Sequence, residues 1–214
     1  MAGRLTLIYR KLYSRFGPQH WWPGDSPFEV AVGAILTQNT NWQNVEKAIK
    51  NLKRYKLLNP QKLHKLPQQR LAFLIRPAGY YNVKAKRLKY FLDFLFNAYG
   101  GDIKKMSRFG TEVLRRQLLL VNGIGPETAD SILLYALGKP IFVIDAYTKR
   151  ILGRHRLIGE GATYENVQNL FMENIKNDVG LFNEYHALLV RLGKEFCAKK
   201  KGKCDLCPLD SPNS

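Results

Sequence analysis

LVNGIGPETADSILLYALGKPIFVIDAYTKR, residues 120–150, is the stretch of sequence that decides the fold. Gly123 and Gly125 bracket a turn, where glycine can take positive φ and lets another backbone come close. Pro126 suits the first position of a helix, and apolar residues follow it at helical spacing. A helix that begins after such a turn presents backbone N–H groups and a partial positive charge, which favours a bound anion. The turn therefore predicts a phosphate site, although a bare glycine pair is more often a plain helical connection inside a core.

A single carboxylate, Asp145, follows the apolar run at 141–144 in the same stretch. Its place before Ala146-Tyr147-Thr148 suits the N-cap of a helix, which is a purely structural role. A carboxylate held in this way also has a fixed orientation, so it can stabilise a developing sugar cation or activate a water molecule against it. The two roles are compatible, and Asp145 is the candidate residue for chemistry.

The chain is strongly basic. Its 214 residues carry 34 Lys and Arg against 17 Asp and Glu, for a formal net charge of +17. Such an excess favours a polyanionic partner, and beside the glycine turn it indicates nucleic acid, although a merely basic soluble protein has the same composition. No run approaches the roughly 20 apolar residues that cross a bilayer, and the N-terminus has no signal-type core. We therefore expect a cytoplasmic protein without a membrane partner.

Helical periodicity dominates the rest of the chain. An apolar face at residues 5–16 predicts an N-terminal helix. Strand signals are scarce, and the short apolar run at 141–144 is one of them. Connecting segments are short, so the sequence predicts an all-α protein. The other predicted helices cover residues 26–37, 41–57, 66–74, 83–99, 110–121, 146–157, 164–175 and 182–197.

The cysteines gather near the C-terminus. Cys197, Cys204 and Cys207 have the spacing C-x6-C-x2-C, which is typical of a zinc or iron–sulfur centre. Both centres usually want four protein ligands, and no His lies nearby in the sequence. Three unligated thiols are the alternative. Lysines fill the first loop and can meet phosphates; they are Lys199, Lys200, Lys201 and Lys203.

Two aromatic pairs lie at turns. Trp21-Trp22 stands between His20 and Pro23, where the rings can stack a nucleobase or seal a junction between helices. Tyr80-Tyr81 precedes a basic run, and core packing beside a solvated helix face explains that pattern equally well. The basic run comprises Lys84, Lys86, Arg87 and Lys89.

Taken together, these motifs resemble the endonuclease III superfamily of DNA glycosylases, from about residue 28 to 207. Residues 120–150 are similar to its helix–hairpin–helix and following aspartate loop. The resemblance implies an all-α, two-domain fold with a cleft between the domains. Residues 26–137 would form a helical-barrel domain carrying the hairpin at 120–137, and residues 1–25 with 138–214 would form the second domain. It also implies double-stranded DNA containing damaged bases as the partner of a DNA-associated monomer.

The resemblance extends to individual residues. AILTQNT at 34–40 is similar to a segment whose Gln fills the gap left by a flipped base, here Gln38. PAGYYNVKA at 77–85 is similar to a second wedge loop, with Tyr80 at the wedge position. Gly123, Ile124 and Gly125 would grip the DNA backbone. The three cysteines match three ligands of a [4Fe–4S] cluster, while Asn213 stands at the fourth position, so the cluster can be complete with another ligand, incomplete, replaced or absent.

A departure at Glu127 decides the subclass. Bifunctional members carry at this position a Lys that forms a Schiff base with the sugar, and Glu127 has no amine. The motifs as a set are most similar to the 3-methyladenine DNA glycosylases of endonuclease III type. This likeness implies a base excision repair hydrolase without AP-lyase activity, in which Asp145 steadies the sugar and Trp21 or Trp22 stacks the flipped base. Two alternatives stay open: a glycosylase for mismatched or oxidised bases, and a non-catalytic DNA-binding protein of the same fold.

Overall fold

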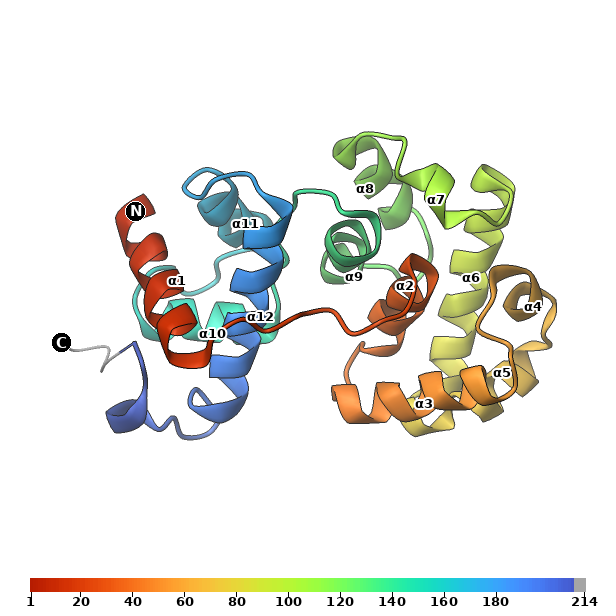
Figure 1. The fold of residues 1–214 in the computed structure, drawn as a ribbon, viewed down its shortest axis with the longest axis horizontal. Helices are drawn as coiled ribbons and strands as arrows, with labels where there is room; N and C mark the ends of the chain where they lie inside the picture. The colour runs from red at the N-terminus through yellow and green to blue at the C-terminus, as the bar shows by residue number, and fades with distance from the viewer. Residues whose placement is uncertain (210–214) are drawn as a thin grey trace. The chain divides into compact units, whose positions relative to one another are not determined.

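The computed structural model describes residues 1–209, which form helices and loops without a strand (Figure 1). The all-α prediction is therefore confirmed. Asn213, the residue at the fourth cluster position, lies outside the described residues. The chain divides into two compact units: unit 1 is Met1–Trp22 with Pro140–Ser214, and unit 2 is Pro23–Lys139.

Unit 2 holds most of the helices. They are α2 (Pro27–Leu36), α3 (Trp42–Arg54), α4 (Pro60–Lys65), α5 (Gln68–Leu74), η1 (Arg76–Ala78), α6 (Tyr81–Tyr99), α7 (Ile103–Met106), α8 (Thr111–Leu119), α9 (Pro126–Ser131) and η2 (Ile132–Ala136). Unit 1 contains α1 (Ala2–Phe16), α10 (Ala146–Arg154), α11 (Tyr164–Met172), α12 (Val179–Glu195) and η3 (Cys204–Leu206).

The core of unit 2 forms around α2. Every α2 residue from Phe28 to Leu36 is buried, and α3, α6, α9 and η2 pack against the helix. A helix that is apolar on all sides belongs inside a core. The exception is Glu29, whose buried carboxylate lies 2.6 Å from the Lys53 ammonium of α3. This ion pair compensates the cost of placing a charge there.

In unit 1, α1 packs against α12. Its predicted apolar face is buried at Leu5, Ile8 and Leu12. The buried Tyr185 hydroxyl of α12 donates a hydrogen bond to the Leu5 carbonyl at 2.9 Å, and burial raises the pKa of this phenol. Apolar packing and one buried hydrogen bond therefore join the first helix to the last one.

The strand signal at 141–144 was wrong. Residues Ile141 to Ile144 are buried, but they form an irregular segment leading into α10. Side chains of α11 satisfy its backbone instead of a neighbouring strand: Gln168 donates to the Phe142 carbonyl at 2.7 Å, and the Ile144 N–H donates to the Tyr164 hydroxyl at 3.3 Å. A buried backbone group needs a partner, and here the side chains provide it.

Helix boundaries differ modestly from the sequence predictions. The short helices α4 and α7 were missed, because six and four residues show too little periodicity. The predicted helix 66–74 begins at Gln68, and α3 ends at Arg54 rather than 57. α9 continues into the π-helical turn η2, where the Leu137 N–H bonds the Ile132 carbonyl.

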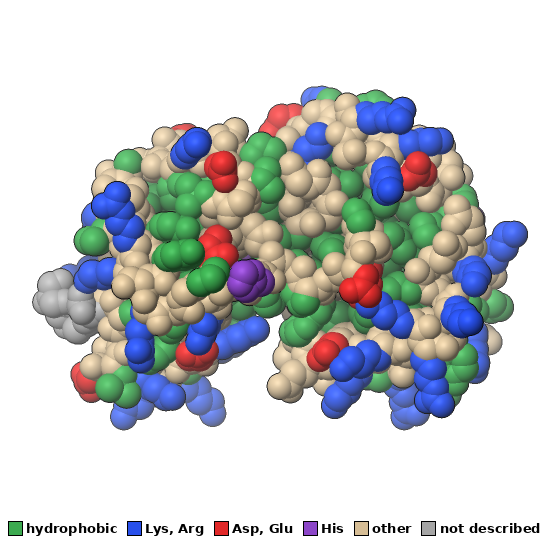
Figure 2. All heavy atoms as spheres, viewed as in Figure 1, with side chains coloured by type: hydrophobic (Ala, Val, Ile, Leu, Met, Phe, Trp, Pro, Cys, Tyr) green, Lys and Arg blue, Asp and Glu red, His purple; other side chains and the backbone are tan. Residues whose placement is uncertain are grey.

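Positive side chains are frequent on the surface of both units, as Figure 2 shows for one face. Within residues 1–209, no helix is long and apolar enough to cross a membrane. Most of the Lys and Arg side chains in residues 1–209 lie at the protein surface.

One buried ion pair ties the hairpin helices together in unit 2. Arg115 of α8 contacts the fully buried Asp130 of α9 through Nε at 2.8 Å and through Nη2 at 3.2 Å. Removing one partner of a buried pair typically costs about 3–5 kcal/mol, because a charge is left in a poor solvent. We expect Arg115→Met to lower the free energy of unfolding by that amount, as measured by urea denaturation.

The matched control is Glu46→Gln, which breaks the exposed Lys50–Glu46 pair on α3. Exposed pairs contribute about 0–1 kcal/mol, so this variant should unfold like the parent protein. Equal stability of Arg115→Met and Glu46→Gln would contradict a structural role for the buried pair.

Candidate functional site

The glycine turn of unit 2 uses its two glycines differently. Gly123 has φ +85°, and a Cβ built there would lie 2.4 Å from Cγ of Arg87. Gly125 has φ −92° and is the N-cap of α9, and a Cβ there meets nothing within 4 Å. The fold therefore requires glycine at position 123 but not at position 125. At Gly125 the missing side chain leaves the backbone open to the outside.

Ile124 is buried and does not lie where a contact with the DNA backbone was expected. Its side chain is 4% exposed, and its N–H donates to the Val121 carbonyl at 3.0 Å. The residue therefore anchors the turn in the core of unit 2 and offers neither its side chain nor its N–H to a ligand. The exposed positions of the turn are Asn122, Gly125 and Glu127.

Gln38, at the end of α2, is bonded to this same turn. Its amide nitrogen donates to the Gly123 carbonyl and to the Thr128 hydroxyl, both at 2.9 Å. Its amide oxygen accepts from the Arg87 guanidinium of α6 at 2.6 Å. The predicted gap-filling side chain is thus held against the hairpin, and Arg87 fixes both Gln38 and the shape of the turn.

The predicted wedge is presented to solvent. Tyr80 is 72% exposed and takes φ +45°, directly after Gly79 at φ +69°. Two residues before Tyr80, the Ala78 carbonyl accepts a hydrogen bond from the Lys84 ammonium at 2.7 Å. Lys84 belongs to the basic run that follows the aromatic pair in the sequence, and its side chain is 1% exposed. Burial, with the neighbouring Arg87 acting in the same direction, lowers its pKa to about 8. Lys84 is therefore a brace for the Tyr80 turn.

Glu127 occupies the first turn of α9 and is exposed, and its carbonyl accepts a hydrogen bond from the Ser131 hydroxyl. A carboxylate in the first turn suits the positive end of a helix. It supplies no amine for imine chemistry at this position.

Asp145 in unit 1 is the N-cap of α10, as the sequence predicts. Its Oδ1 accepts the Thr148 N–H at 2.7 Å, and its side chain is 12% exposed. The buried segment before it and the helix after it both restrict its backbone. The carboxylate therefore combines a fixed position with partial access to solvent.

His186 of α12 faces this carboxylate, which sequence reasoning missed. Nε2 of His186 lies 3.6 Å from Oδ2 of Asp145. Burial lowers the pKa of the imidazole, and the Asp145 charge opposes this effect only in part. The ring is therefore neutral at neutral pH. No pattern in the sequence pairs two residues so far apart, so only the packing of α10 against α12 identifies this contact.

The tryptophan pair also belongs to unit 1. Trp21 and Trp22 are half-buried, and their rings meet edge to face at a centroid distance of 5.4 Å. The Lys194 ammonium of α12 lies 5.6 Å from the Trp21 centroid. The rings are fixed aromatic surfaces of the kind that can stack a base.

The cysteine segment is fastened by arginines of α10. Arg154 donates to Sγ of Cys197 at 3.2 Å, to the Ala198 carbonyl at 2.8 Å and to the Lys199 carbonyl at 3.0 Å.

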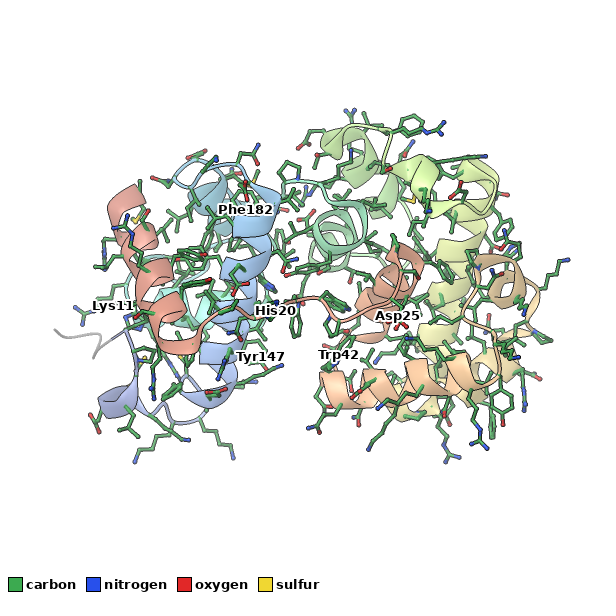
Figure 3. All side chains as sticks on the ribbon, in the orientation of Figure 1. Lys11, His20, Asp25, Trp42, Tyr147 and Phe182 are labelled. Carbon is green, nitrogen blue, oxygen red and sulfur yellow. The ribbon has the colours of Figure 1, made fainter. Side chains whose placement is uncertain are left out.

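Arg150 donates to the Cys197 carbonyl at 2.8 Å and to the Gly193 carbonyl at 3.3 Å, and its guanidinium lies over the Tyr147 ring. Figure 3 labels Tyr147, which packs on the backbone of Gly193 in α12.

The three thiols differ in their surroundings. Cys197 is buried, Cys204 is exposed and Cys207 is half-buried. In residues 1–209, no group of three or more His, Cys, Asp or Glu side chains could hold an ion. The iron–sulfur cluster therefore stays a prediction from the sequence, to be tested by iron and sulfide analysis of the protein.

A family model covers the hairpin and the aspartate loop together. Residues 32–177 match the HhH-GPD superfamily of base excision DNA repair proteins. A Methanocaldococcus jannaschii protein described as a DNA repair glycosylase is 49% identical over 204 residues, which are 94% of this chain and 92% of that protein. The chain belongs to the HhH-GPD superfamily and is a DNA glycosylase of base excision repair.

More distant relatives share the fold. Endonuclease III of Thermotoga maritima is 28% identical over 201 residues, covering 94% of this chain and 87% of that protein. The structure of H. pylori 3-methyladenine DNA glycosylase (MagIII) bound to 1,N6-ethenoadenine has 29% identity and a TM-score of 0.78, covering 89% of this chain and 97% of the other. An endonuclease III–DNA complex has 21% identity and a TM-score of 0.83, covering 98% and 93%. These likenesses confirm the predicted superfamily and all-α fold.

The arginine contacts predict how the cysteine segment is ordered. Arg154→Met removes hydrogen bonds to three successive residues of the segment. At about 1 kcal/mol for each net hydrogen bond, local opening should become about tenfold or more easier. We expect faster hydrogen exchange of the backbone amides at 198–203, measured by mass spectrometry.

Arg156→Met is the matched control, because it removes the same charge from an exposed position two residues later. Exchange in the 198–203 segment should not change in this variant. If Arg154→Met also left exchange unchanged, something other than Arg154 would hold the segment.

Proposed function

We propose that the chain is a monofunctional glycosylase that hydrolyses the N-glycosidic bond of alkylated purines such as 3-methyladenine in duplex DNA. One observation carries the proposal: a fixed carboxylate is present at Asp145, while the hairpin residue where bifunctional relatives use Lys is Glu127. The likeness to the H. pylori 3-methyladenine glycosylase, at 29% identity over 89% of this chain, supports it.

The chemistry asks little of an acid catalyst. An N3-alkylated adenine is already cationic, so it leaves readily and the sugar becomes oxocarbenium-like. Asp145 stabilises that positive charge and orients the water that attacks it. Trp21 or Trp22 stacks the extruded base, and flipping costs only a few kcal/mol, least for bases that pair poorly.

The hairpin holds the DNA backbone without reading sequence. Its exposed positions offer main-chain groups at the start of a helix, which suits a phosphate. Tyr80 acts as the wedge, and Gln38 fills the space left by the extruded base. For the second role Gln38 must exchange its bonds to Gly123 and Thr128 for bonds inside the duplex.

A second candidate is a glycosylase for mismatched bases. A thymine/uracil-DNA glycosylase of Pyrobaculum aerophilum is 26% identical over 208 residues, covering 93% of this chain. Duplexes containing 3-methyladenine, uracil or thymine opposite guanine, or 8-oxoguanine separate the candidates, because mass spectrometry identifies each released base.

The reaction generates the first functional prediction. Wild-type protein should release 3-methyladenine from methylated duplex DNA and leave an intact abasic site. Asp145→Asn should lower the single-turnover rate by roughly two or more orders of magnitude, in the range for losing a charge-stabilising group. Asn still caps a helix, so α10 should remain folded.

Asp178→Asn is the matched control, since Asp178 caps α12 through a 2.8 Å bond from the Leu181 N–H. Its rate should equal that of the wild type. Borohydride trapping of a covalent protein–DNA adduct at high yield would contradict the monofunctional proposal, and near-normal turnover of Asp145→Asn would remove Asp145 from the mechanism.

A second prediction concerns the hairpin. Gly125→Thr keeps a residue suited to the N-cap, and a Cβ at this position meets nothing within 4 Å, so stability should be unchanged. Its side chain blocks close approach of a phosphate backbone. Binding to damaged and undamaged duplexes should weaken alike, by about tenfold or ~1.4 kcal/mol, in fluorescence anisotropy titrations.

Gly123→Ala provides the opposite case. Its Cβ meets Arg87 and its φ is positive, so it should unfold more easily by about 1–3 kcal/mol. Wild-type affinity of Gly125→Thr for undamaged duplex would show that the turn does not contact the backbone.

A further inference from the structure

The geometry points to His186 as a positioning residue for Asp145: from the core of unit 1, its ring contacts Oδ2 and sets the plane of the carboxylate that acts on the sugar. The inference rests on the proposed function of Asp145 and adds a residue to it.

The two carboxylate oxygens have different partners. The helix cap engages Oδ1 through the Thr148 N–H at 2.7 Å, and Oδ2 faces Nε2 of His186 at 3.6 Å. The terminal torsion of an Asp side chain is broad, so one hydrogen bond restricts the carboxylate plane only weakly. A second contact on the other oxygen defines it. Each oxygen has two lone pairs, so Oδ2 keeps acceptor capacity for the reacting groups.

The separation of 3.6 Å is longer than the 2.7–3.2 Å typical of an N–H···O hydrogen bond. Catalytic hydrogen bonds are often long in the free enzyme and tighten in the complex. A shift of a few tenths of an ångström in α10 or α12 is enough to form the bond. His186 itself has little freedom, because it is 5% exposed and the Phe142 ring meets it edge-on.

Neutrality of the ring suits this role. A cationic imidazolium beside Asp145 would offset the negative charge that the reaction needs. Burial lowers the pKa of His186, so the neutral ring can orient the carboxylate while leaving its charge in place. A lysine or arginine at the same position would orient the Asp145 carboxylate but would also offset its negative charge.

Two amide variants test the contact. Gln places its side-chain nitrogen about as far from the backbone as Nε2 of His, whereas the shorter Asn reaches only the Nδ1 position. We expect His186→Asn to lower the single-turnover rate about 10- to 100-fold, the range for a misplacement of about 1 Å. His186→Gln should recover most of the rate. Affinity for duplex DNA should stay within about twofold in both variants, because the residue acts on the chemical step.

Tyr185→Phe is the matched control for lost stability. It removes a buried hydrogen bond one residue away on α12, so it should lower the melting temperature without changing the rate. Thermal unfolding of all variants is measured in parallel, and the rates are compared below the lowest melting temperature.

A double-mutant cycle with Asp145→Asn separates this inference from the function on which it rests. If His186 acts through Asp145, His186→Asn should have no further effect in the Asp145→Asn background. An equal fold-loss in both backgrounds, a wild-type rate for His186→Asn, or equally slow Asn and Gln variants would each overturn the positioning role while the slow Asp145→Asn variant still supports the proposed function. A wild-type rate for Asp145→Asn would overturn both.

Discussion

The proposed site in unit 1 depends on the hydrogen bond from the Thr148 N–H to Oδ1 of Asp145. The bond caps the start of α10, and it fixes the first acid that follows the hairpin in the sequence. The buried segment ahead of it is held by Gln168 and Tyr164 rather than by a strand partner. The chain can therefore arrive at the cap along an irregular path with its backbone groups satisfied. Helix capping and the proposed catalysis therefore both require the same fixed position of the Asp145 carboxylate.

Unit 2 solves a different problem, because its hairpin must stay rigid while exposing main chain. Two side chains from outside the turn keep it rigid: Arg87 of α6 occupies the space over Gly123, and Gln38, which follows α2, bonds the turn. The Arg115–Asp130 pair then joins the two helices of the hairpin. A preorganised turn loses little conformational entropy on binding a phosphate. This low entropy cost raises the affinity of a contact that reads no sequence.

The sequence predicted the elements whose signals are local. Helical periodicity located most helices, and the N-cap pattern placed Asp145 correctly, because both depend on neighbours within one or two turns. Interactions between distant residues were beyond it. The burial of Lys84 against the Ala78 carbonyl and the approach of His186 to Asp145 depend on how helices pack. The wrong strand prediction at 141–144 has the same cause. A buried apolar run has the same sequence pattern whether a neighbouring strand or distant side chains bond its backbone.

Charge acts on two length scales in this protein. The net charge of +17 lies largely on exposed Lys and Arg, whose attraction for phosphates is screened over about 8–10 Å at physiological salt. Asp145 has the opposite sign and is 12% exposed beside a neutral ring, so solvent and salt weaken its field less. The positive surface can thus attract a polyanion without cancelling the one negative group that a sugar cation needs. A basic protein keeps a local site for cations by burying the acid and leaving its neighbour uncharged.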